Sequence, residues 1–418
     1  MDIAIITIGD EILNGSTIDT NSAFIGKELA LIGISLREKI TISDKRQHIL
    51  ESLENYIGKF PLILITGGLG PTKDDITKHT LADYFNSELI MNSEVLEFIE
   101  KRFAKRGLTL TELNKQQAMV PAACTVVKNN MGTAPGMWFE KDNSIIISMP
   151  GVPYEMQAMV KDSVIPLLQS RFELPAIYNI HIMTSGIGES WLSEKIADIE
   201  DSLPDAIGLA YLPSPGIVKL RLTARGKNYA VLQTTTQPFV DAIIKRLGDK
   251  VFSVSAETME EKIGSMLNQL SATLGTTESC TGGSIARKII SVPGSSDYYL
   301  GSIVAYHNDI KTTILGVSQN ILNEYGAVSE EAIREMLKGG LKILKSDYVI
   351  ATSGIAGPGG GTEDKPVGTV FIGVAGKGDI VIKKFLFAND RPVNIEYTCM
   401  FALHELRMLL QKHLEKQA

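Results

Sequence analysis

The sequence predicts an α/β protein with a doubly wound N-terminal domain, a small α+β middle domain and a C-terminal α/β domain. Short continuous apolar runs end in glycine or polar turns, as buried parallel strands do. Amphipathic helical patterns alternate with these runs, which is typical of doubly wound sheets. The chain has 418 residues, too many for one ordinary hydrophobic core. We therefore expect three domains, at residues 1–173, 174–254 and 255–418.

The N-terminal part alternates strands with helices. Strands are predicted at residues 3–8, 34–42, 61–66 and 144–149, and helices at residues 21–32, 44–57 and 154–168. Asp44 stands where the N-cap of the second helix is expected. Because ligand sites in doubly wound domains lie beyond the carboxyl ends of the strands, the loops at those ends are candidate binding segments.

The middle and C-terminal parts follow a less regular order. The middle part has extended runs at residues 178–183 and 217–224 and helices at 189–199 and 230–247, with no obvious chemistry. The C-terminal part is predicted as a helix from residue 258, a strand–turn–helix at 271–287, a helix through 333–344, strands at 348–352, 368–374 and 380–387, and a helix at 393–413.

Composition excludes several classes of protein. Hydrophobic residues make up 44% and charged residues 21%, with a net charge of −7 and no basic block, so direct nucleic-acid binding is not expected. Cys124, Cys280 and Cys399 lie far apart and form neither a disulfide framework nor a zinc spacing. The opening MDIAIITIGDEIL predicts a buried strand rather than a signal peptide, and no apolar run is long enough for a membrane span. We expect a cytoplasmic protein.

The turn ESCTGG, residues 278–283, is the first candidate site. It joins a strand to a helix, so Ser279 is expected beside the unpaired N–H groups of a helix N-terminus. Such a place either holds a phosphate or stabilises the oxyanion of an acyl transfer. A serine at a helix start is also an ordinary N-cap.

Two further segments favour acyl transfer. GSIVAYHNDIK, residues 301–311, ends in Lys311, and a buried lysine can act as a base because desolvation lowers its pKa. His307 in the same segment is a rival base. TSGIAGPGGGT, residues 352–362, contains five glycines, which either let the backbone approach a ligand or form only a flexible loop. No Gly-Lys-Ser/Thr follows, so it is not a Walker A loop.

Together, ESCTGG, VAYHNDIK at 304–311, SGIAGPGGGT at 353–362 and NDR at 389–391 resemble the C-terminal domain of the CinA family, which also occurs alone as nicotinamide mononucleotide amidase. The resemblance implies hydrolysis of nicotinamide mononucleotide to nicotinate mononucleotide and ammonia, with no cofactor. It implies Ser279 as nucleophile, Lys311 as base and Tyr306 as an aid to proton transfer. The substrate-binding residues it implies are Thr281, Gly282, Gly283, Thr352, Ser353, Gly354 and Arg391, with Arg391 on the substrate phosphate. Ile395 stands where the family usually has a second arginine.

GGLGPTKDD, residues 67–75, is the second candidate site. Its glycine turn can cradle phosphates through backbone N–H groups, and Asp74 and Asp75 offer oxygen ligands for Mg²⁺. Turn formation and helix capping would explain the same residues without a ligand. Asp10 and Glu11, after the first strand, would add carboxylates at the same sheet edge.

GDEIL at 9–13, DTN at 19–21, GGLGPTKDD, GTAPG at 132–136 and PGVPYEM at 150–156 resemble the N-terminal CinA domain, which is similar to the molybdopterin-binding fold of MoaB and MogA. The CinA domain is associated with metal-dependent cleavage of ADP-ribose to AMP and ribose 5-phosphate, whereas the molybdenum cofactor proteins bind a pterin phosphate. The resemblance implies a divalent metal such as Mg²⁺, with or without K⁺, held by Asp74 and Asp75. The phosphate- and substrate-binding residues it implies are Asp10, Glu11, Asn21, Gly67, Gly68, Gly70, Thr72, Gly132 and Gly151.

The two resemblances imply a bifunctional hydrolase that recycles pyridine nucleotides. Its partners would be small nucleotides, nicotinamide mononucleotide and ADP-ribose, and a homodimer is expected. Two alternatives stay open: a competence-associated protein that binds a recombination partner, and a molybdopterin-binding protein whose C-terminal domain is inactive.

Overall fold

The structure is a computed structural model that describes residues 1–72, 75–387 and 390–417. Asp74 and Asn389, both part of predicted motifs, therefore lie outside the described residues. The chain forms two compact units. The first consists of Met1–Tyr178 and Arg225–Leu232, and the second of Asn179–Ala224 and Gln233–Ala418. Among the described residues, no helix is both long and apolar enough to cross a membrane.

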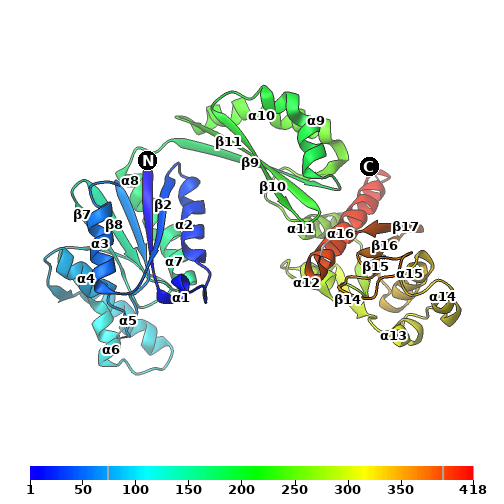
Figure 1. The fold of residues 1–418 in the computed structure, drawn as a ribbon, viewed down its shortest axis with the longest axis horizontal. Helices are drawn as coiled ribbons and strands as arrows, with labels where there is room; N and C mark the ends of the chain where they lie inside the picture. Colours follow the sequence, from blue (N-terminus) through cyan, green and yellow to red (C-terminus); the bar gives the residue numbers. More distant parts are fainter. Residues whose placement is uncertain (73–74, 388–389, 418) are drawn as a thin grey trace. The chain divides into compact units, whose positions relative to one another are not determined.

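A six-stranded sheet in the order β2-β1-β3-β8-β7-β6 forms the centre of the first unit (Figure 1). Its strands are β1 (Asp2–Ile8), β2 (Ser35–Ile42), β3 (Leu62–Thr66), β6 (Thr125–Val127), β7 (Gly136–Lys141) and β8 (Ser144–Met149). β2, β1, β3 and β8 are parallel, and β7 and β6 continue the sheet in antiparallel fashion. The four parallel strands are those predicted, whereas the β6–β7 pair was not.

Helices cover both faces of this sheet. One face carries α2 (Thr20–Ala30), α7 (Pro153–Met159), the π-helical turn η2 (Val160–Val164) and α8 (Ile165–Arg171), and the other carries α3 (Arg46–Tyr56) and α4 (Thr77–Tyr84). Successive residues of a strand face opposite sides. Ile5 therefore packs in one core with Ile25 of α2, and Ile6 packs in the other with Ile49 of α3. The predicted doubly wound fold is confirmed.

Asp44 does not cap α3 as predicted. The helix begins at Arg46, and Lys45 is the N-cap residue without a side-chain hydrogen bond. A cap must directly precede the first helical turn, and Asp44 is one residue too early; its side chain lines a cavity described below. The remaining elements of this unit are α1 (Asp10–Leu13), β4 (Leu89–Met91), α5 (Ser93–Lys105), α6 (Glu112–Lys115), η1 (Gln116–Ala118) and β5 (Met119–Pro121).

The middle of the chain forms a four-stranded sheet in the order β10-β11-β9-β12. Its elements are β9 (Ala176–Ser185), α9 (Glu189–Asp201), β10 (Ile207–Ser214), β11 (Ile217–Gly226), α10 (Tyr229–Leu247), η3 (Gly248–Lys250) and β12 (Val251–Ser253). β10 pairs antiparallel with β11 and was not predicted. Its polar and proline-containing end, Leu212–Ser214, carries little strand signal.

The C-terminal sheet has the order β14-β13-β15-β16-β17. Its strands are β13 (Leu274–Glu278), β14 (Tyr299–Val304), β15 (Tyr348–Gly354), β16 (Thr369–Gly376) and β17 (Asp379–Leu386). The helices are α11 (Met259–Gln269), α12 (Ser284–Ile290), the 3-10 turn η4 (Ser295–Asp297), α13 (Asn308–Thr313), α14 (Gln319–Glu324), α15 (Glu330–Leu344) and α16 (Arg391–Glu415).

Buried contacts fix the C-terminal layers. α11 and α16 pack on one face of the sheet, where Ile263 and Leu403 share a core with Ile350, and α15 packs on the other, where Ile333 meets Val349. β14, β13 and β15 are parallel neighbours. Their carboxyl ends therefore meet at one edge of the sheet, which brings the residues after each of these strands together.

Candidate active sites

Ser279 and Lys311 meet at the carboxyl edge of the C-terminal sheet. Ser279 directly follows β13, and Lys311 lies on the short helix α13. Lys311 Nζ lies 3.1 Å from Ser279 Oγ. Nζ also donates to the carbonyl oxygens of Ala305 at 2.7 Å and Tyr306 at 3.2 Å. The sequence placed both residues in one site, and the geometry gives them hydrogen-bonding contact.

Lys311 is buried without a counter-ion. Its side chain is 1% exposed, and among the described residues no carboxylate oxygen lies within 4.0 Å of Nζ. Burial disfavours the ammonium form and lowers the pKa of Lys311 from its ordinary value of 10.5. A neutral amine can donate to the two carbonyl oxygens and still use its lone pair to accept the Ser279 proton.

His307, the rival base, faces elsewhere. Its side chain is 75% exposed, and its Nδ1 accepts a hydrogen bond from the Asp309 amide as the N-cap of α13. It does not line the pocket that contains Ser279. The geometry therefore favours Lys311 over His307 as the candidate base.

The helix N-terminus behind Ser279 is already occupied. The carboxylate of Glu278 accepts hydrogen bonds from the amides of Gly283, Ile285 and Ala286, at the start of α12. The expectation that these N–H groups are unpaired was wrong, because the residue before the serine is a buried acid that reaches them. A phosphate cannot use the same donors, so the phosphate interpretation of ESCTGG loses its basis.

The amides of Cys280 and Thr281, in the same turn, are available to a reacting carbonyl, because no protein acceptor for them is found within the described ranges. The neighbouring amides are already used: Ser279 N donates to Thr352 O, and Gly282 N donates to Ser279 O. Backbone N–H groups next to a nucleophile are the usual donors of an oxyanion hole. The turn can therefore stabilise the negative oxygen of a tetrahedral intermediate.

A pocket of 260 Å³ opens over the Ser279–Lys311 pair. Of the predicted residues, Ser279, Tyr306, Lys311, Ser353, Gly354 and Arg391 line it, together with Cys280, Asn308, Ala327, Val328 and Ala356. The predicted residues Thr281, Gly282, Gly283 and Thr352 do not line it; the hydroxyls of Thr281 and Thr352 lie 2.8 Å apart. Asn308 was not predicted, although it stands inside the VAYHNDIK motif.

Arg391 and Tyr306 lie at the mouth of this pocket. Arg391 donates to the Tyr306 hydroxyl at 3.0 Å and to Gly357 O at 2.7 Å. Among the described residues, the Tyr306 hydroxyl has no hydrogen bond to Ser279 or Lys311. Ile395, in place of a second arginine, packs half-buried against the core. Arg391 and Tyr306 thus present a guanidinium and a hydroxyl group to the pocket.

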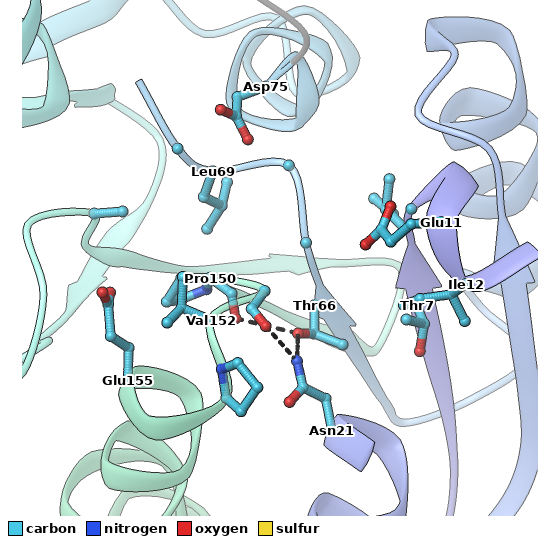
Figure 2. Close-up of a pocket in the computed structure, with 18 of the residues that line it drawn as sticks. Thr7, Glu11, Ile12, Asn21, Thr66, Leu69, Asp75, Pro150, Val152 and Glu155 are labelled. Carbon is cyan, nitrogen blue, oxygen red and sulfur yellow. Dashed lines mark hydrogen bonds between the residues drawn. The ribbon is translucent and has the colours of Figure 1, made fainter. Parts of the chain in front are cut away.

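A larger cavity of 550 Å³ lies at the carboxyl ends of β1, β3 and β8. The predicted residues Glu11, Asn21, Gly67, Gly68, Gly70, Asp75 and Gly151 line it. Asp10 and Thr72 do not, and Gly132 lines an adjoining cavity of 260 Å³. Asn21 is buried and donates to Thr66 Oγ1 and Gly151 O, which ties three of the lining segments together (Figure 2).

Glycine is required in the loop after β3. A Cβ on Gly67 would lie 2.2 Å from Ile8 O, and one on Gly68 would lie 2.2 Å from Thr77 Oγ1. Both residues have positive φ, 116° and 65°. No acceptor for the amides of Gly68, Leu69 and Gly70 is found within the described residues. Consecutive free amides in such a loop form a cradle for phosphate oxygens.

Carboxylates surround this cavity. Glu11, Asp75 and Glu155 come from three different segments and lie around it (Figure 2), and Asp44 joins them. Burial raises the pKa of Asp44, and neighbouring Asp10 adds to the shift. No Lys or Arg is found among the described lining residues. Asp44 could have been anticipated, because it follows β2 at the same edge of the sheet.

The carboxylates fit a divalent cation only in part. No group of three or more His, Cys, Asp or Glu side chains in the described part of the chain is arranged to hold a metal. Mg²⁺ is commonly held by one or two carboxylates together with substrate phosphates. The donor set therefore suits a cation that arrives with a phosphate ligand. Asp75 is also bound to the Thr72 amide at 3.0 Å, which stabilises the glycine loop.

The folds and the two sites define a multidomain α/β protein with a molybdopterin-binding-type N-terminal domain. Family models match in three segments: "Probable molybdopterin binding domain" over residues 4–170, "Damage-inducible protein CinA KH domain" over 181–253 and "CinA C-terminal domain" over 256–410. The chain belongs to the CinA family. The resemblance found in the sequence is thereby confirmed, and the KH match covers the middle segment, which the sequence analysis describes only as a small α+β domain.

Two relatives align with this chain over nearly its whole length. The CinA-like protein of Cytophaga hutchinsonii is 46% identical over 98% of both chains, and that of Flavobacterium psychrophilum is 44% identical over 100% of both. Among solved structures, the competence or damage-inducible protein from Enterobacter asburiae is 32% identical and covers 37% of this chain and 99% of its own, with a TM-score of 0.35.

Proposed function

We propose that the C-terminal domain hydrolyses the carboxamide of nicotinamide mononucleotide to nicotinate mononucleotide and ammonia. The observation that carries the proposal is the 3.1 Å approach of Lys311 Nζ to Ser279 Oγ in a pocket where the lysine is buried and has no counter-ion. An amide has a poor leaving group, so its hydrolysis needs an activated nucleophile, oxyanion donors and a proton for the departing amine. Lys311 would activate Ser279 and return the proton to the leaving nitrogen, and the amides of Cys280 and Thr281 would stabilise the oxyanion.

The proposed reaction has two halves. Neutral Lys311 takes the Ser279 proton as Oγ attacks the carboxamide carbon, and the oxyanion is stabilised by the amides of Cys280 and Thr281. The intermediate collapses, Lys311 returns the proton to the nitrogen, and ammonia leaves an ester on Ser279. Water then attacks this ester with Lys311 again as base, which releases the carboxylate product and restores the serine.

Recognition of the mononucleotide is assigned to the mouth of the pocket. Arg391 presents a guanidinium whose geometry suits a phosphate. Its hydrogen bonds to Gly357 O and the Tyr306 hydroxyl hold it in place. We assign Tyr306 first to positioning Arg391, because its hydroxyl contacts that residue.

The test is ammonia release from nicotinamide mononucleotide by the wild type, Ser279→Ala and Lys311→Ala. Both variants should lose activity, by about 10³-fold or more, because nucleophile and base act as a unit. Intact activity of Ser279→Ala would refute the mechanism. If the wild type releases no ammonia, nicotinamide mononucleotide is not the substrate, and the alternative of an inactive C-terminal domain is favoured.

For the N-terminal domain we propose metal-dependent hydrolysis of ADP-ribose to AMP and ribose 5-phosphate. Support comes from the free amides of Gly68 to Gly70 in a cavity lined by carboxylates and, within the described residues, by no Lys or Arg. A pyrophosphate brought into such a cavity needs a cation to offset the negative charge. A divalent ion on Asp75 and Asp74 would neutralise the pyrophosphate and orient water.

This second activity is tested by AMP formation from ADP-ribose with Mg²⁺. Asp74→Ala and Asp75→Ala should lose it and keep ammonia release. Joint loss of both activities would contradict two independent sites. Tight binding of a pterin phosphate without AMP formation under any divalent cation would instead support the molybdopterin-binding alternative.

A further inference from the structure

Glu278 is the last residue of β13 and directly precedes Ser279. Its side chain is fully buried, at 0% exposure. Oε2 accepts hydrogen bonds from the amides of Gly283 at 2.9 Å and Ile285 at 3.1 Å, and Oε1 accepts one from Ala286 at 2.9 Å. Each carboxylate oxygen therefore serves the first turn of α12.

Two hydroxyls complete the surroundings of this carboxylate. Thr276 Oγ1 and Ser302 Oγ lie 3.3 Å and 3.4 Å from Glu278 Oε1. Among the described residues, no Lys, Arg or His nitrogen lies within 4.0 Å of it. Hydrogen bonds and the helix dipole thus replace the water that a buried carboxylate loses. Without these hydrogen bonds, the buried carboxylate would strongly destabilise the fold.

The turn that carries Ser279, residues 279–283, lies between Glu278 and the helix α12 whose first amides its carboxylate binds. Ser279, Cys280 and Thr281 connect the strand to the residues whose amides bind Glu278, and Gly282 and Gly283 have positive φ of 58° and 94°. A turn fixed at both ends presents its serine oxygen and its free amides in one geometry. Catalytic groups lose much of their effect when displaced by about 1 Å.

The main chain of Glu278 reaches the base as well. Its carbonyl oxygen accepts a hydrogen bond from Ala305 N at 2.8 Å, and Ala305 O accepts one from Lys311 Nζ at 2.7 Å. Glu278 therefore acts on two groups. Its side chain fixes the turn that carries Ser279, and its carbonyl oxygen holds Ala305, whose own carbonyl oxygen binds Lys311. These contacts place both reacting groups relative to one fixed point.

We propose that Glu278 is a positioning residue of the amidase, which holds Ser279 Oγ against Lys311 and aims the amides of Cys280 and Thr281 at the reacting carbonyl. This inference rests on the proposed amidase function. Glu278 does not touch substrate and lies outside the pocket lining. Its effect should therefore fall on the chemical step and not on substrate binding.

Glutamine at position 278 is the sharpest test. Both carboxylate oxygens accept backbone N–H groups, so in either orientation a Gln side chain points its NH₂ at another donor. We expect Glu278→Gln to lower kcat for ammonia release about 100-fold, with KM within about twofold of the wild type. A purely structural role would instead reduce the amount of active protein, which active-site titration measures separately.

Glu261 provides the matched control. It accepts a hydrogen bond from the Thr258 amide at 2.7 Å in the capping box of α11, away from the amidase pocket. Glu261→Gln should change the melting temperature but leave kcat and KM within about twofold. If Glu278→Gln does the same, or if its KM rises in step with the fall in kcat, the positioning role is refuted.

Two further measurements keep the test decisive. If Glu278→Gln does not fold, Thr276→Val removes one donor at Oε1, and an unchanged kcat in that variant refutes the proposal. If the wild type releases no ammonia, the proposed function fails separately. Ser279-dependent release of p-nitrophenol from p-nitrophenyl acetate then measures positioning, and equal rates for wild type and Glu278→Gln overturn it.

Discussion

Arg391 donates a hydrogen bond to the hydroxyl of Tyr306 at 3.0 Å, which joins the start of α16 to the segment after β14. A second donor of the same guanidinium binds Gly357 O at 2.7 Å. These two hydrogen bonds hold the guanidinium in one position at the edge of the pocket. A binding group that is already held in place loses less entropy on binding. Substitution of either Arg391 or Tyr306 should therefore change the affinity for substrate.

Arg391→Ala should reduce the affinity for substrates that carry a phosphate group. We expect KM for nicotinamide mononucleotide to rise about 10- to 100-fold, because a charge-assisted contact to phosphate is lost. Nicotinamide riboside, which lacks the phosphate, should be used equally poorly by the wild type and the variant. Arg334→Ala, an exposed arginine paired with Glu330, is the control and should behave as wild type. Equal losses on both substrates would contradict a phosphate contact.

Tyr306→Phe separates two roles for the tyrosine. Its hydroxyl contacts Arg391, so removal should raise KM about three- to tenfold with kcat within about twofold of the wild type. Steady-state kinetics on nicotinamide mononucleotide measures both constants. A large fall in kcat at constant KM would instead place Tyr306 in the proton path, as the family resemblance implies.

The rate should rise with pH as Lys311 loses its proton. Burial lowers the pKa of Lys311 from 10.5, and only the neutral amine can accept the Ser279 proton. Log kcat/KM should therefore increase with pH and level off at an inflection below 10.5. Lys311→Arg stays charged and should be at least about 10³-fold slower, without this inflection.

The exposed lysine Lys338 provides the control for this profile. It pairs with Glu335 on α15, and Lys338→Arg should reproduce the wild-type curve. A wild-type profile that falls with rising pH would show that the ammonium form is the active one. The base assignment would then be wrong.

The sequence predicts the parts of the sites that lie in short motifs. Ser279 and Lys311 could be found because a hydroxyl in a strand–turn–helix and a lysine after a strand are local patterns, and parallel strands bring their ends together. Glu278 could not be assigned in the same way. Its role depends on which amides face its carboxylate after folding, and local spacing does not determine this.

Strands and helices were predictable where burial imposes a continuous pattern. β8, buried along its whole length, was predicted at its observed bounds, 144–149. The β10 strand and the β6–β7 pair were missed, because β10 is partly exposed and β6 has only three residues. Short or exposed strands are determined by pairing with their neighbours, and one sequence does not reveal that pairing.

Gly68→Ala should damage the N-terminal site selectively. The new Cβ would lie 2.2 Å from Thr77 Oγ1 at a φ of 65°, so the glycine loop must shift. We expect AMP formation from ADP-ribose to fall at least about tenfold while ammonia release stays unchanged. Gly15→Ala is the matched control, with a φ of 78° and no atom within 4 Å of the new Cβ. Equal loss in both variants would attribute the effect to backbone strain alone.

His404 should make the second unit sensitive to acid. Its Nδ1 lies 2.9 Å from Ser185 Oγ. Burial lowers the pKa of His404 to about 4, and the nearby positive charge of Arg407 adds to this. In the unfolded chain the pKa of His404 returns to 6.5, so between pH 6.5 and 4 the unfolded state binds a proton that the folded state does not. The contribution of His404 to stability is therefore full above pH 6.5 and is lost as the pH falls toward 4.

His404→Gln removes this titration, so its unfolding free energy should depend less on pH than that of the wild type. Urea unfolding at pH 7.5 and 4.5 should show the wild type losing about 2 kcal/mol more than His404→Gln between the two conditions. Identical pH dependence in wild type and His404→Gln would mean that His404 is not held neutral by its surroundings.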